Sequence, residues 1–112
     1  MKLEIQTIWS PDLDPPSEGL PDDLGDFDIF MQVSLGEAGE PGGEVFSFSV
    51  SSPSALTRIE PNRFISHTLV LDYFDWERIK KRIEKLLRHT GSCKNWDEVI
   101  KSLSGYLHYS DE

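Results

Sequence analysis

Residues 27–35 read FDIFMQVSL and alternate between apolar and polar side chains along most of their length. A β-strand with one buried and one solvated face produces this pattern, because successive side chains point to opposite faces of a sheet. The alternation returns at residues 46–51, FSFSVS, after the connection GEAGEPGGE at residues 36–44. Glycine and proline in that connection favour a turn. Together these segments predict a long antiparallel hairpin joined by a Gly-rich loop.

Two further segments, one on each side of the hairpin, also alternate and predict strands. In residues 3–9 the pattern places Trp9 on the apolar face with the other large residues, and we expect its ring to be buried; partial exposure at the mouth of the acidic connection is the alternative for this tryptophan alone. In residues 64–71 the pattern places His67 on the apolar face. A histidine in that position is more often a core residue with a satisfied hydrogen bond than a catalytic base.

Helical patterns dominate the remainder of the chain. Residues 52–60 predict one short helical turn that begins after Pro53. A longer helix is predicted to begin after Asp75 as N-cap and to end at Gly91, and a second begins after Asn95, with Glu98 at the capping-box spacing. The apolar stripes of these two helices comprise Trp76, Ile79, Ile83, Leu86 and Leu87, and Trp96, Val99, Ile100, Leu103 and Tyr106.

The order of these elements predicts an α+β fold. We expect a two-layer sandwich, in which a mainly antiparallel four-stranded sheet carries two C-terminal helices packed on one face. Both helices are amphipathic and need an apolar surface to cover, which the sheet supplies. The chain has 112 residues, near the commonest domain size, so residues 1–112 are expected to form a single domain.

Charge is distributed unevenly along the chain, whose formal net charge is −9. Residues 3–57 contain no Lys, Arg or His, whereas acidic and basic residues nearly cancel from Arg58 onward. An acidic half repels nucleic acid and anionic lipid, and it attracts a basic protein surface. The carboxylates of this half are Glu4, Asp12, Asp14, Glu18, Asp22, Asp23, Asp26, Asp28, Glu37, Glu40 and Glu44.

Motifs that carry catalysis or hold a cofactor are absent from the sequence. No serine lies in a nucleophile motif, and there is no phosphate-binding or dinucleotide-binding fingerprint. No His, Cys and Asp cluster has zinc spacing, and the pairs Asp12/Asp14 and Asp22/Asp23 lack the EF-hand pattern. The basic residues of the first long helix are diluted by acidic ones, which favours a solvated helix face over a nucleic-acid contact. We therefore expect no enzyme activity, no cofactor and no metal site.

The single cysteine, Cys93, rules out an internal disulfide and fits a reducing compartment. The N-terminal residues alternate like a strand and lack the apolar centre of a signal peptide. No apolar run approaches the ~20 residues that a membrane span requires. These features predict a soluble cytoplasmic protein without a membrane partner.

Three segments are distinctive: MKLEIQTIWSPDLD (1–14), FDIFMQVSLGEAGEPGGEVFSFSVSSP (27–53) and LVLDYFDWERIKKRIEKLLRHTGSCKNWDEVIKSLSGYLHYSDE (69–112). Together they resemble the immunity protein 8 family, bacterial immunity proteins of polymorphic toxin and contact-dependent growth inhibition systems. The most specific parts are the Ser10-Pro11-Asp12 step and the entries into the two helices, at residues 73–76 and 96–99. The resemblance implies a cytosolic protein that binds one cognate toxin domain and blocks it.

The acid-rich connections and the missing catalytic set favour an inhibitory binding protein, either a monomer or a weak dimer. A nuclease with a basic cleft is the expected toxin, because carboxylates can occupy phosphate sites. The expected contacts are Asp12, Asp14, Glu18, Asp22, Asp23, Asp26, Glu37, Glu40 and Glu44. The next candidate is the polar face of the sheet, with Glu4, Gln6, Asp28, Gln32, Ser47 and Ser49.

Two other functions are weighed against this one. The first is a small acidic adaptor or structural module that self-associates through an exposed sheet edge. The second is a small hydrolase with a cleft between the loops and the sheet, in which His67 or a carboxylate of raised pKa acts as the base.

Overall fold

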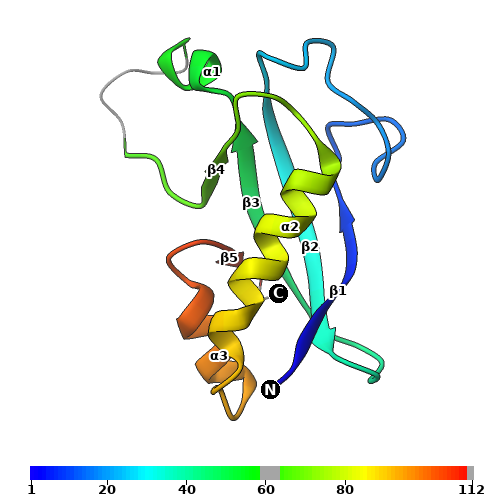
Figure 1. The fold of residues 1–112 in the computed structure, drawn as a ribbon, viewed down its shortest axis with the longest axis vertical. Coiled ribbons are helices and arrows are strands. Elements are labelled where there is room, and N and C mark those ends of the chain that lie inside the picture. Colours follow the sequence, from blue (N-terminus) through cyan, green and yellow to red (C-terminus); the bar gives the residue numbers. More distant parts are fainter. Residues whose placement is uncertain (59–63, 111–112) are drawn as a thin grey trace.

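A computed structural model describes residues 1–58 and 64–110 and confirms the α+β class (Figure 1). The elements are β1 (Leu3–Trp9), β2 (Asp28–Glu37), β3 (Glu44–Ser51), α1 (Pro53–Arg58), β4 (Thr68–Val70), α2 (Trp76–Leu87), a 3₁₀ helix (Arg88–Thr90), α3 (Trp96–Leu103) and β5 (His108–Tyr109). Helix α1 is the turn predicted after Pro53. Residues 59 and 60 of that prediction lie outside the described residues.

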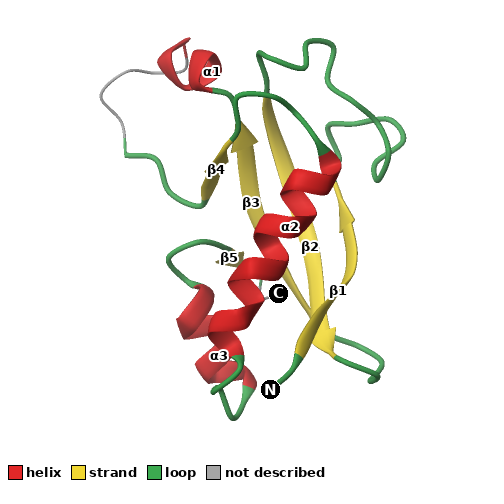
Figure 2. Cartoon of the chain, in the orientation of Figure 1, coloured by secondary structure: helices red, strands yellow, loops and turns green. Residues whose placement is uncertain are grey.

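The sheet is mainly antiparallel, as predicted (Figure 2). β2 pairs antiparallel with both β1 and β3. The predicted fourth strand is wrong in length and direction, because only Thr68–Val70 pair with β3, and they run parallel to it. His67 precedes them with a φ of 51°, a left-handed conformation that interrupts extended backbone. The strand β5, which pairs antiparallel with β3, was not predicted because two residues carry no periodic pattern.

Both C-terminal helices contribute to the same core, as predicted. Helix α2 crosses the sheet diagonally and buries Ile79, Ile83 and Leu87 (Figure 1). Helix α3 lies beside the C-terminal end of α2 and buries Val99 and Leu103. The predicted stripes therefore identify the faces by which these helices pack, except that Tyr106 lies beyond the end of α3 and is 53% exposed, so its assignment to the stripe is wrong.

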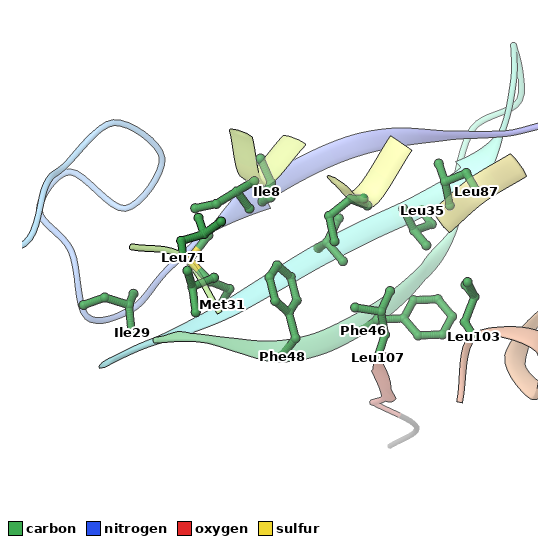
Figure 3. Packing of buried hydrophobic residues seen from close by; sticks show 14 of the residues in the cluster. Ile8, Ile29, Met31, Leu35, Phe46, Phe48, Leu71, Leu87, Leu103 and Leu107 are labelled. Carbon is green, nitrogen blue, oxygen red and sulfur yellow. The ribbon is translucent and has the colours of Figure 1, made fainter. Parts of the chain in front are cut away.

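The buried side chains form one cluster between the sheet and the helices (Figure 3). β2 contributes Met31, Val33 and Leu35 to it, and β3 contributes Phe46, all of them fully inaccessible to solvent. Burial of each such side chain stabilises the fold by roughly 1.5–3 kcal/mol. The central hairpin is therefore the main support of the molecule.

A β-bulge in β1 reverses the expected orientation of Trp9. The register with β2 shifts between Ile5 and Thr7, so two residues of β1 face one position of its partner. Beyond the shift, Ile8 pairs with Val33 on the core face and is buried. Trp9 consequently lies on the opposite face and is half-buried, so the prediction that it faces the core is wrong.

The helix caps mostly agree with the sequence. The Asp75 side chain accepts a hydrogen bond from the Glu77 N–H, and Asn95 accepts one from the Glu98 N–H, both at 2.9 Å. Gly91 is not a left-handed C-terminal cap, because its φ is −58°. The chain instead continues from α2 into the 3₁₀ helix, where the Thr90 hydroxyl donates to the Leu87 carbonyl oxygen.

We expect Phe46→Ala to lower the free energy of unfolding by about 3–5 kcal/mol, because it leaves a cavity in the core. The matched control is Phe30→Ala in the neighbouring strand, where the ring is 41% exposed. That variant should cost roughly 1 kcal/mol or less. Urea denaturation of both variants measures the difference, and equal losses would contradict the assignment of the two sheet faces.

Candidate functional site

The longer acidic connection, residues 10–26, is hydrogen-bonded to the first residues of β2. The buried Ser10 hydroxyl donates to the Phe30 carbonyl oxygen at 2.5 Å, and the Asp12 carboxylate accepts from the Phe30 N–H at 2.9 Å. Two side chains thus satisfy backbone groups of β2 at the point where β1 ends. The Ser10-Pro11-Asp12 step has a structural role, and Asp12 is partly engaged by it.

The other side of this loop is fastened to the start of α2. Leu13 is buried in the core, and the Trp76 indole N–H donates to the Gly19 carbonyl oxygen at 2.8 Å. The Phe74 N–H donates to the Leu24 carbonyl oxygen, also at 2.8 Å. Although the loop has no regular secondary structure, these contacts hold it at both sides. Its carboxylates therefore project from a loop whose backbone is held in place.

The carboxylates of the longer acidic loop differ in whether they form hydrogen bonds or ion pairs within the protein. Asp26 forms an ion pair with Arg58 at 2.7 Å, and Asp23 accepts from the Gly25 N–H at 2.9 Å. Three others are exposed and make no side-chain hydrogen bond or ion pair with any described residue. These are Asp14, Glu18 and Asp22.

The second acidic loop joins β2 to β3 at the opposite end of the sheet (Figure 2). It bends over β1, because the Gln6 amide donates to the Gly42 carbonyl oxygen at 2.5 Å. Glu37 and Glu40 are exposed and make no such contacts with described residues. Glu44 is half-buried and accepts a hydrogen bond from the Tyr109 hydroxyl at 2.9 Å, so it supports β5.

The nine carboxylates predicted as contacts therefore form two groups. β2, whose ten residues separate the loops, spans about 30 Å. A partner that contacts both loops must span that distance. The strand predicted over residues 27–35 already lies between the two acidic connections, and the structure confirms it as one uninterrupted strand.

Between the loops lies the face of the sheet opposite α2, which we call the open face. On β1, β2 and β3 the strand pairing assigns to it Glu4, Thr7, Trp9, Asp28, Phe30, Gln32, Ser34, Ser47 and Ser49. The bulged Gln6 joins this face by accepting a hydrogen bond from the Ser34 hydroxyl. Trp9 pairs across to Gln32 and Gln32 to Ser47, while Phe30 pairs with Ser49. Trp9 and Phe30 are thus large aromatic side chains beside small or polar neighbours.

Trp9, which the sequence pattern assigned to the core, lies on the open face. The sequence does contain a signal of the bulge in β1, because Gln6 and Thr7 are consecutive polar residues that interrupt the apolar–polar alternation of this strand. A bulge at that point moves Trp9 to the open face.

Positive charge lies on the opposite side of the molecule. Helix α2 carries Arg78, Lys80, Lys81, Arg82 and Lys85. Its buried stripe faces the core, so these cations lie on the other faces of the helix, where Arg82 and Lys85 line the groove between β4 and α2. The segregation seen along the sequence is therefore also a segregation in space.

His67 does not occupy the core position predicted from sequence. It is half-buried beside β4, and its Nε2 lies 2.8 Å from the Ser104 carbonyl oxygen. It lines a groove of about 730 Å³ between β4 and α2, whose described lining contains no carboxylate that could orient an imidazole as a base. Among the described residues no group of three His, Cys, Asp or Glu side chains could hold a metal ion.

The arrangement is that of a small α+β protein with charged loops on a packed support. The sequence model of the immunity protein 8 family matches residues 3–111, essentially the whole chain. The chain therefore belongs to the immunity protein 8 family, as its sequence features predicted. This membership implies an immunity protein that binds a cognate toxin. Neither a curated protein nor a solved structure matches the chain. Among the described residues, no helix has the length and apolar character needed to traverse a bilayer.

The ion pair at the end of the longer loop predicts a measurable pH effect. The hydrogen bond from Arg58, with a smaller one from Ser54, holds the pKa of Asp26 below its ordinary value of 3.8. A lowered pKa in the folded state contributes stability above the ordinary pKa, and this contribution is lost as pH falls through the folded pKa. We expect Arg58→Gln to raise the pKa of Asp26 more than Ser54→Ala does. Carboxyl NMR titration of both variants tests this, and the reverse order would contradict it.

Proposed function

We propose that this chain neutralises a toxin domain with a basic surface, such as a nuclease, by occupying that surface with its acidic loops. The observation that carries the proposal is the set of exposed, unengaged carboxylates on a fastened loop: Asp14, Glu18 and Asp22. Carboxylates without internal partners lose no stabilising contact when a partner's cations approach. A nucleic-acid-cleaving domain needs a basic cleft for its substrate, so such a domain is the expected target.

The nine carboxylates predicted from sequence contribute unequally in this proposal. Glu37 and Glu40 join the three unengaged carboxylates of the longer loop as direct contacts. Asp12, Asp23, Asp26 and Glu44 have internal partners, so we assign them mainly to holding the loops and strands in place.

In this proposal, long-range electrostatic attraction between the loops and the toxin domain mainly raises the association rate. Complementary charges raise association rates by ~10–10³-fold, and the effect falls steeply with ionic strength. Exposed ion pairs contribute only ~0–1 kcal/mol each. The affinity must therefore come mostly from a few desolvated side chains. A cytoplasmic site of action is part of the proposal, and the unpaired Cys93 thiol is consistent with a reducing compartment.

The triple variant Asp14→Lys, Glu18→Lys, Asp22→Lys should slow association with the toxin domain encoded beside this gene about 10-fold or more at low salt. It should also flatten the salt dependence of the association rate, because the steering charges are reversed. The control triple Glu77→Lys, Glu84→Lys, Asp97→Lys changes the net charge equally on the helix side. Stopped-flow or biolayer measurements compare the two, and equal slowing would move the contact away from the loop.

Self-association is the second candidate, because β1 is an edge strand of the sheet. Two features oppose it: the bulge after Ile5 interrupts the edge, and Glu4 places a charge along it. We therefore expect a monomer of 12.8 kDa from micromolar to near-millimolar concentration. Light scattering or sedimentation equilibrium measures the mass, and a dimer that Glu4→Lys alters would favour the adaptor function instead.

A further inference from the structure

We infer that the open face is the centre of the contact with a basic toxin domain, with Trp9 and Phe30 as its apolar anchors and the two acidic loops as its rim. This inference rests on the proposed function and names the surface that performs it. Protein interfaces commonly have an apolar centre that is enriched in aromatic residues and a polar rim.

The first support is the orientation of Trp9. Without the bulge after Ile5, the alternation of β1 would direct this ring into the core, where burial of a large apolar surface is favourable. The bulge instead directs Ile8 inward and Trp9 outward. Bulges often re-aim a side chain beside a functional site, and Trp is enriched among residues whose truncation costs the most binding energy.

The second support is the way in which Phe30 is held. Its ring is 41% exposed, whereas its backbone N–H and carbonyl are bonded to Asp12 and Ser10. The backbone at this position is therefore fixed before any partner arrives. Fixing a contact residue in advance reduces the ordering cost of binding. The same bonds attach the longer acidic loop, part of the proposed rim, to the backbone of Phe30.

The third support is the shape of the surface around the two rings. The neighbouring side chains on β3 are Ser47 and Ser49, paired with Gln32 and Phe30. Beside these short side chains the Phe30 ring is 41% exposed, whereas Trp9 is half-buried. Such a surface suits a partner that offers a pocket for the Phe30 ring and contacts the accessible part of Trp9.

Charge identifies the kind of partner. Residues 3–57, which include β1, β2 and β3, contain no basic residue, and Glu4 and Asp28 project from the open face. Two copies of this face would repel each other, whereas a basic domain would be attracted. A second copy of the chain is therefore not the proposed occupant.

The area of the open face alone is too small for a stable interface, so the loops must contribute to the contact. The three-stranded face covers roughly 500 Å² from its strand length and spacing. A stable interface needs about 800 Å² from each partner. The loops at the two ends supply the remaining area, so the anchors and the rim form one continuous surface.

The test measures binding to a catalytically inactive form of the toxin domain encoded beside this gene. We expect Trp9→Ala to raise the Kd about 30-fold or more and Phe30→Ala about 10-fold. The control is Tyr106→Ala, an aromatic residue that is 53% exposed and lines the groove beside α2. It should change the Kd less than about 2-fold. Circular dichroism and thermal melts show whether each variant is folded.

The outcomes separate this inference from the proposed function. If the wild-type chain does not bind the domain, the proposed function fails and this inference fails with it. If the wild type binds and both open-face variants bind equally well, the inference is wrong while the function stands. Should Trp9→Ala not fold, Phe30→Ala decides alone, because that ring is largely outside the core. Dimerisation of the wild type that Phe30→Ala abolishes would identify a second copy as the occupant and overturn the inference.

Discussion

Burial of one face of β2 is the constraint on which the rest of the structure depends. Met31, Val33 and Leu35 are fully inaccessible, and they lie between β1 and β3 and beneath the helices. A shift of one residue in pairing would move this whole row into solvent. The register of the central strands is therefore strongly determined, and both acidic loops are placed at the two ends of β2 as a consequence.

The same burial leaves the opposite face of β2 accessible. Its side chains include Phe30 and Gln32, and the bulge in β1 adds Trp9 to them. A sheet with one covered and one open face offers a rigid surface that can be changed without disturbing the core. For an immunity protein this separation is useful, because recognition of a toxin can vary while the fold is retained.

The features that the sequence predicts correctly are those that neighbouring residues determine. The alternation of β2 and β3, the stripes of α2 and α3, and the caps at Asp75 and Asn95 depend on neighbouring residues. The structure confirms them apart from Tyr106, which is exposed beyond the end of α3. The features that were missed or predicted wrongly are those that depend on contacts with a segment far away in the chain. The parallel pairing of β4, the two-residue strand β5 and the bulge in β1 depend on partners remote in the chain.

The amino-acid sequence alone determined the α+β class, the main elements, the membership of the immunity protein 8 family and the absence of cations from residues 3–57. These properties follow from periodicity and composition, which neighbouring residues carry. Only the tertiary structure decided that internal partners engage Asp12, Asp26 and Glu44, and that Trp9 faces outward. Those outcomes depend on strand register and on contacts between residues far apart in the chain, and the geometry that fixes them exists only after folding.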